Sequence, residues 1–175
     1  MAKPLALNPD RLFPSQPHTR DIARRLYSQI AHLPIISPHG HTDPAWFAEN
    51  APFENPAALF IEPDHYVYRM FYSQGIALEA LGVRRADGSR ADVDPRDAWG
   101  ILAANYHLFR GTPSRSWLDW VFTEVFGLDV TLTPETARLY YDTIDAALQT
   151  PAFRPRALFD RFGIEVITTT EGALD

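Results

Sequence analysis

The chain has 175 residues, which fits one domain of ordinary size, and 46% of them are hydrophobic, enough for a packed core. Its formal net charge is −6 and its 16 Lys and Arg residues form no basic block, which argues against nucleic acid as a partner. The absence of cysteine excludes disulfides and thiolate metal sites, and no apolar stretch reaches the ~18–20 residues of a membrane span. The N-terminus also lacks a signal-peptide h-region, so we expect a cytoplasmic protein.

The 15 prolines indicate where helices begin. Five of them follow a short capping side chain, in the pairs Asn8–Pro9, Asp43–Pro44, Asn55–Pro56, Asp94–Pro95 and Thr133–Pro134. A capping residue followed by proline is typical of the N-cap and first position of a helix. These prolines therefore predict helix starts, not a low-complexity linker.

Most of the chain is expected to be helical. Thr19 is expected to cap a helix over residues 20–31, in which Ile22, Leu26 and Ile30 fall on one face. Further helices are expected after residues 43 and 55, and over residues 64–74, 95–108, 116–126, 134–149 and 154–162. The aromatic residues of these segments, Trp99, Trp117, Trp120, Phe122 and Phe126, are expected to pack in the core.

A buried strand at Ile35–Ile36 is expected to run into a polar turn that carries two histidines. Residues i and i+2 of a strand point to the same face, so His39 and His41 would project together, with Gly40 letting the backbone bend between them. Two neutral imidazoles followed by Asp43 form the start of a divalent-metal site. The alternative is a chance His-x-His sequence on a solvated loop.

The β-branched run over residues 164–170 predicts a second strand, parallel to the first. Two strands by themselves are barely stable, and buried parallel strands belong to a sheet that is covered on both faces. We therefore expect residues 1–175 to be a single incomplete domain, the N-terminal portion of a larger α/β protein. Residues 43–162 would be a large, mostly helical insertion between its first two strands.

Three blocks of the chain resemble one enzyme family. The His39–Gly40–His41 turn resembles the metal motif of the amidohydrolase superfamily. Together with the block over residues 64–69 and the closing block over residues 164–171, it is similar to uronate isomerase, also called glucuronate isomerase. The resemblance implies the first two strands of a (β/α)₈ TIM barrel and an enzyme that interconverts hexuronates and ketohexuronates. It covers only the N-terminal part of the family's length.

The resemblance also implies roles for individual residues. His39 and His41 would be metal ligands, with zinc as the metal, although only a partial site lies within this chain. Tyr66 would move a proton at the reacting carbon of the sugar, and His65 would contact the substrate or hold that tyrosine. The remaining substrate-binding residues would be Arg69, Thr169 and Thr170.

Each of these residues also has a simpler interpretation. Tyr66 could be a core aromatic residue on a helix, His65 a helical histidine without a site role, and Arg69 a partner in a surface ion pair. Ser37–Pro38 precedes the first histidine where many members of the family carry an acidic residue, which bears on the support of the metal.

The partner implied for the intact enzyme is a small-molecule hexuronate, and the enzyme could form a homo-oligomer. D-glucuronate and D-galacturonate remain open as substrates, and the 175-residue chain by itself is expected to be inactive. Two rival readings are a metal-dependent hydrolase of the same superfamily and a non-catalytic helical binding module. The block over residues 64–66 favours the isomerase over the hydrolase.

Overall fold

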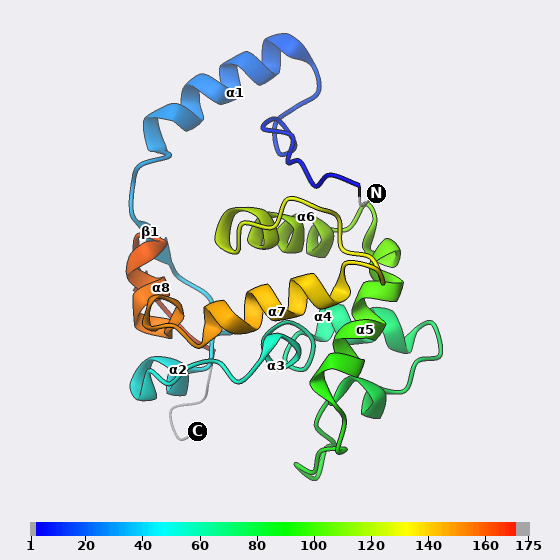
Figure 1. Cartoon of the computed structure of the whole chain (residues 1–175). Coiled ribbons are helices and arrows are strands. Elements are labelled where there is room, and N and C mark those ends of the chain that lie inside the picture. Colours follow the sequence, from blue (N-terminus) through cyan, green and yellow to red (C-terminus); the bar gives the residue numbers. More distant parts are fainter. Residues whose placement is uncertain (1–2, 171–175) are drawn as a thin grey trace. The chain divides into compact units, whose positions relative to one another are not determined.

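The structure is a computed structural model that describes residues 3–170 and divides the chain into two compact units (Figure 1). The first unit comprises residues 1–7 and 53–150, and the second comprises residues 8–52 and 151–175. Within residues 3–170, no helix combines the length and the apolar character that a membrane span requires.

The first unit is built from helices. Its α-helices are α3 (Pro56–Phe60), α4 (His65–Tyr72), α5 (Pro95–Asn105), α6 (Pro113–Trp120) and α7 (Ala137–Leu148). Shorter helical turns are η1 (Leu78–Leu81), η2 (Tyr106–Phe109) and η3 (Val121–Val125), the last of which is a π-helical turn. Apart from an isolated bridge between Pro4 and Val130, the described part of this unit holds no β pairing, which confirms the prediction of a mostly helical segment.

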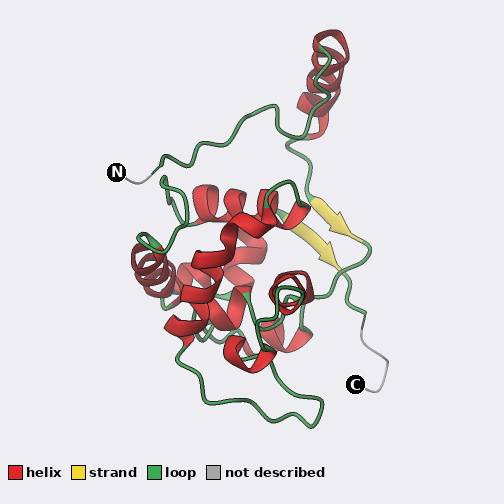
Figure 2. Cartoon of the chain, turned by 90° about the vertical axis from the view of Figure 1, so that its right-hand side faces the viewer, coloured by secondary structure: helices red, strands yellow, loops and turns green. Residues whose placement is uncertain are grey.

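The second unit combines a small sheet with helices (Figure 2). It contains α1 (Pro17–Ile30), β1 (Ile35–Ser37), α2 (Pro44–Glu49), η4 (Pro151–Phe153), α8 (Pro155–Arg161) and β2 (Ile164–Ile167). β1 and β2 pair in parallel, as predicted, with Ser37 opposite Ile167. Because parallel strands point the same way, the residues that follow β1 and β2 leave the sheet at the same edge.

The core of the first unit is aromatic. Trp99 on α5 is 1% exposed, and Phe122 is fully buried with its ring centroid 5.1 Å from that of Tyr140 on α7. Core packing is thus confirmed for Trp99 and Phe122, but it is wrong for Trp117 and Trp120, which are 61% and 38% exposed. Trp117 lies on α6 one position before the buried Leu118, about 100° around the helix from it, and so points away from the buried face.

Short side chains followed by proline cap three helices as predicted. Asp43, Asn55 and Asp94 each accept a hydrogen bond from a backbone N–H in the first turn of α2, α3 and α5. The prediction is wrong for Asn8, whose backbone oxygen accepts from Arg11 in a turn.

Two other helix starts differ from the prediction. α7 starts at Ala137 instead of Pro134, because the Thr136 hydroxyl accepts from Thr133 N and donates to Thr131 O, which keeps residues 133–136 in a turn. α1 starts at Pro17, since the side chain of Gln16 accepts from the backbone N–H of Thr19 and provides the cap.

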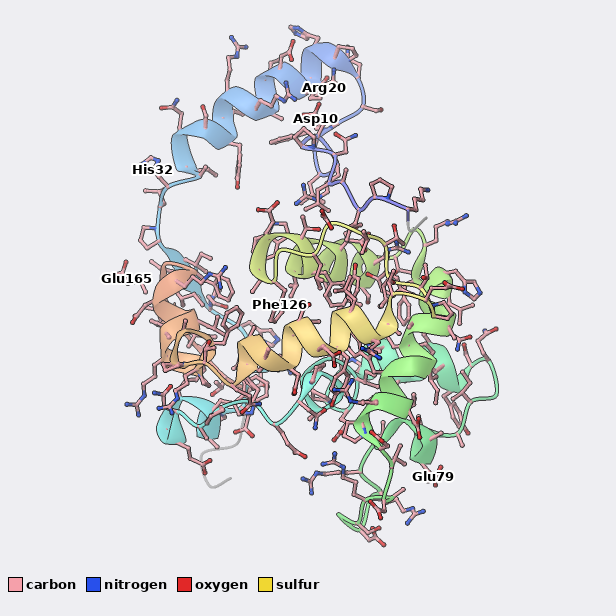
Figure 3. The ribbon with its side chains drawn as sticks, in the orientation of Figure 1. Asp10, Arg20, His32, Glu79, Phe126 and Glu165 are labelled. Carbon is pink, nitrogen blue, oxygen red and sulfur yellow. The ribbon has the colours of Figure 1, made fainter. Side chains whose placement is uncertain are left out.

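The apolar stripe of α1 faces solvent. Ile22, Leu26 and Ile30 do lie on one helix face, but they are 37%, 67% and 57% exposed. Asp10 pairs with Arg20 at 3.6 Å near the start of this helix (Figure 3). α1 is therefore held to the preceding segment by this ion pair and by an edge-to-face contact between Phe13 and Tyr27, while its apolar face makes no core among the described residues.

The strands are also more exposed than expected. Ile35 and Ile36 of β1 are 49% and 62% exposed, and Val166 of β2 is 43% exposed. The expectation of a buried first strand is wrong for the described chain, because the two-stranded sheet is not enclosed on both faces there.

Candidate functional site

The turn after β1 carries the two candidate metal ligands, His39 and His41. The Ser37 hydroxyl donates a hydrogen bond to the backbone oxygen of His39 at 2.9 Å. A Cβ at Gly40 would lie 2.8 Å from the backbone oxygen of Thr168, closer than Cβ atoms approach other atoms. Glycine is therefore required at this position so that the turn after β1 can lie against the residue that follows β2.

The two imidazole rings face each other. Their Nε2 atoms lie 3.0 Å apart, and the rings meet edge to face with centroids 4.9 Å apart. Two nitrogens bound to one tetrahedral zinc would lie about 3.3 Å apart, given Zn–N distances of about 2.0–2.1 Å. The separation thus suits two ligands of one ion, and it also suits a hydrogen bond between rings of which one carries a proton on Nε2.

Thr170 provides a partner for the other side of one ring. Its Oγ1 lies 3.3 Å from Nδ1 of His41. When Nδ1–H of His41 donates to this hydroxyl, Nε2 carries a lone pair and faces His39. The contact is thus compatible with the tautomer that a metal ligand requires.

The donor set fits a divalent metal as a partial site. Neutral imidazole nitrogen is a common ligand of zinc. No group of three or more His, Cys, Asp or Glu side chains that could hold a metal is found within residues 3–170. His39 and His41 could therefore hold a zinc-type ion as two of its ligands, and the rest of its shell must come from elsewhere.

The loop after β2 continues the pairing with β1 and borders a cavity. Thr168 donates from its backbone N and its hydroxyl to Ser37 O, both at 3.1 Å. Thr169 lines a cavity of about 610 Å³ together with Phe47, Phe159 and Arg156. The loop thus places exposed hydroxyl groups at the same edge of the sheet as the histidines.

Arg156 is a residue of this region that the sequence analysis missed. Its Nε donates to Phe47 O at 2.8 Å and its second terminal nitrogen donates to Ala48 O at 3.0 Å, which satisfies carbonyls at the end of α2. These partners lie more than 100 residues away in the sequence, so no local pattern could have identified them.

The other candidate residues lie on α4. Asp64 caps this helix by accepting from the backbone N–H groups of Tyr66 and Val67. Tyr66 is 60% exposed, and its ring lies against that of His65 with centroids 4.2 Å apart and planes tilted by 35°. Arg69 is exposed and forms no ion pair with any described residue, so the surface ion pair is not found.

Tyr66 also borders a cavity of the first unit. This cavity measures about 300 Å³, and Met70, Phe109 and the exposed Trp117 line it as well. The interpretation of Tyr66 as a core aromatic residue is wrong, because more than half of its side chain is accessible.

The candidate residues therefore fall into two groups. The group at the strand ends of the second unit is His39, His41, Thr169 and Thr170, and the group on α4 of the first unit is His65, Tyr66 and Arg69. All seven side chains are exposed in the described chain.

Comparisons with known proteins agree on one family. The family profile described as glucuronate isomerase matches residues 17–175. A uronate isomerase of Sphingopyxis alaskensis is 66% identical over 175 residues, which are 100% of this chain and 36% of that protein. One from Xanthomonas axonopodis pv. citri is 67% identical over 171 residues, which are 98% of this chain and 36% of that protein.

A solved structure is similar in fold as well as in sequence. The crystal structure of glucuronate isomerase from Caulobacter crescentus has a TM-score of 0.93 and 58% sequence identity, over 97% of this chain and 35% of that one. The chain spans 36% of the length of the two curated relatives named above.

Proposed function

Because the chain belongs to the glucuronate isomerase family, we propose that it acts in the aldose–ketose isomerisation of hexuronates. The reactions would be D-glucuronate to D-fructuronate and D-galacturonate to D-tagaturonate. The observation that carries the proposal is the pair of facing Nε2 atoms on His39 and His41, 3.0 Å apart, beyond the end of β1.

The reaction moves one proton from C2 to C1 of the sugar through an enediol, while a hydroxyl proton moves from O2 to O1. It requires a base, an acid and a group that polarises the sugar oxygens. Tyr66 would take and return the carbon-bound proton, and its 60% exposure leaves the phenol accessible to a substrate. His65 would keep the phenol ring in place by the ring contact at 4.2 Å.

The remaining candidates would bind and orient the substrate. Arg69 has no carboxylate partner among the described residues, so its guanidinium is available for an acidic sugar. Thr169 and Thr170 offer hydroxyl groups beside the two histidines. A zinc-type ion held in part by His39 and His41 would supply Lewis-acid polarisation of a sugar oxygen.

We also propose that β1 and β2 are the first two strands of a (β/α)₈ barrel. In such barrels the active site lies at the carboxyl ends of the strands, which is where this chain carries His39, His41 and Thr170. The exposed apolar residues of α1 and of both strands support the proposal, since a barrel would enclose them. A role in sugar-acid catabolism would place the enzyme in the cytoplasm.

The test is a chimera in which this chain replaces the matching part of the Caulobacter crescentus glucuronate isomerase, which is 58% identical to it. The chimera should isomerise D-glucuronate, and Tyr66→Phe should lower kcat about 10²–10⁴-fold because it removes the group that carries the proton. Tyr72→Phe is the matched control, since Tyr72 lies on the same helix and is 64% exposed. A folded chimera without activity, or equal rates for the two variants, would contradict the proposal.

A further inference from the structure

The first unit holds a second cavity that is rich in positive charge. It measures about 560 Å³ and lies where the N-terminal segment meets the segment before α7. Its charged and titratable lining consists of Lys3, Tyr106, His107, Arg110, Arg115 and Asp119. None of these residues belongs to the proposed isomerase site.

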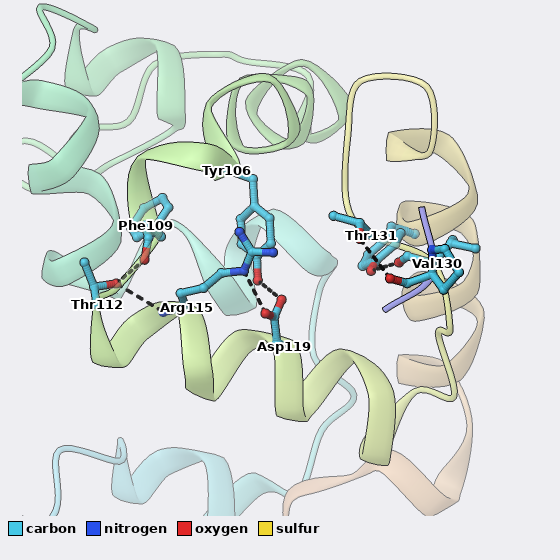
Figure 4. Close-up of polar contacts among 9 residues, drawn as sticks. Tyr106, Phe109, Thr112, Arg115, Asp119, Val130 and Thr131 are labelled. Carbon is cyan, nitrogen blue, oxygen red and sulfur yellow. Dashed lines mark hydrogen bonds and ion pairs between the residues drawn. The ribbon is translucent and has the colours of Figure 1, made fainter. Parts of the chain in front are cut away.

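One wall of the cavity is a fixed polar network. Tyr106 donates from its hydroxyl to Asp119 at 2.8 Å, and Arg115 donates from Nε to the other Asp119 oxygen at 2.7 Å (Figure 4). The Arg115 guanidinium also lies over the Tyr106 ring, 4.2 Å from its centroid. Both oxygens of the carboxylate therefore have donors, and the guanidinium is held in place while its two terminal nitrogens make no hydrogen bond to a described residue.

The other two cations have no counter-ion among the described residues. Neither Lys3 nor Arg110 forms an ion pair with any residue that the structure describes, and both are exposed. The backbone fixes Lys3 at the cavity, because its oxygen accepts from Thr131 N at 2.7 Å and Leu5 N donates to Asp129 O at 2.7 Å. Within residues 3–170, two cations without an ion pair thus border a cavity whose only carboxylate is already engaged.

We propose that this cavity binds a phosphate-class dianion. Three cationic side chains against one carboxylate leave an excess of two positive charges, in a chain whose formal net charge is −6. Clefts lined by charge of one sign concentrate ions of the opposite sign. A phosphate group matches both the charge and the donors, because guanidinium groups bind its oxygens through paired N–H bonds and an ammonium group adds a point charge.

Lys3 provides a selective probe, because it is the only lysine in the chain. The 175-residue chain is treated with an amine-acylating reagent at constant ionic strength, and acylation of Lys3 is followed by mass spectrometry. Inorganic phosphate should slow this acylation in a saturable way, whereas sodium chloride at equal ionic strength should not. Protection that follows ionic strength alone would overturn the proposal.

The variant Arg110→Gln tests the geometry. Arg110 is exposed and has no ion-pair partner among the described residues, so its replacement should leave the fold intact. The phosphate concentration for half protection should rise about tenfold, the usual effect of losing one charge-assisted hydrogen bond. Arg138→Gln is the matched control, because Arg138 is 90% exposed and lies outside the cavity on α7. Equal protection in wild type and Arg110→Gln would refute the site.

A comparison of ligands separates two sources of the dianion. If glycerol 3-phosphate protects Lys3 at a lower concentration than inorganic phosphate does, the ligand is a phosphate ester. Equal protection by the two identifies the free ion.

Discussion

Replacing Asp119 with alanine should destabilise the helical unit by about 3–5 kcal/mol, the usual cost of removing one partner of a largely buried ion pair. The Asp119 side chain is 17% exposed and that of Arg115 is 22% exposed, so solvent screens the pair only in part. Alanine removes a charge-assisted bond and leaves the hydroxyl of Tyr106, a residue that is 2% exposed, without an acceptor. These losses amount to about 1.5–3 and about 1–3 kcal/mol respectively.

The assay is urea unfolding followed by tryptophan fluorescence. Tyr106→Phe removes only the neutral donor and leaves Arg115 bound to the carboxylate, so it should cost less than Asp119→Ala, about 1.5–3 kcal/mol. Asp142→Ala is the control, because Asp142 pairs with Arg96 at the surface and its side chain is 48% exposed, so its loss should cost about 1 kcal/mol or less. A loss of unfolding free energy in Asp119→Ala no larger than that in Asp142→Ala would refute this reasoning.

Three further changes test the structure. Burial raises the pKa of Tyr106 and of Tyr140 above 10.0, so near pH 10 both stay protonated in the folded chain while they ionise in the unfolded chain. The free energy of unfolding should therefore fall as pH rises above about 10. Ionisation of all seven tyrosines near pH 10 in a chain with native circular dichroism would contradict this. Gly40→Ala should lower the free energy of unfolding by about 1–3 kcal/mol, because the new Cβ would lie 2.8 Å from Thr168 O. Gly100 has open space around it within α5, so Gly100→Ala should raise the free energy of unfolding by about 1 kcal/mol in the same urea assay. The chain alone should bind zinc weakly and show negligible isomerase activity, since its described residues provide two facing imidazoles and no larger metal-binding group. In a calorimetric titration, His39→Ala should abolish zinc binding and Thr170→Val should weaken it about tenfold or more. An unchanged zinc affinity in His39→Ala would place the metal elsewhere.

The sequence by itself determined the features that depend on neighbours a few residues apart. Asp43, Asn55, Asp64 and Asp94 cap helices because each carboxylate or amide oxygen reaches a backbone N–H two or three residues ahead. Sequence patterns over a few neighbouring residues also predicted the mostly helical segment and both strands. It also explains the failure at Thr133, where the hydroxyl of Thr136 accepts from the Thr133 backbone N–H and the helix starts later.

Burial and the candidate site were decided by contacts that join distant parts of the chain. The spacing of His39 and His41 indicated a shared face, but the contact of His41 with Thr170 spans 129 residues and the need for Gly40 comes from Thr168. The exposure of Trp117 follows from which face of α6 packs inward.

The cationic cavity is a further product of tertiary structure. It exists because the backbone of Lys3 pairs with that of Thr131, beside Arg110 and Arg115. A side chain's reach limits what local sequence can specify, so contacts across more than 100 residues are set only when the chain packs.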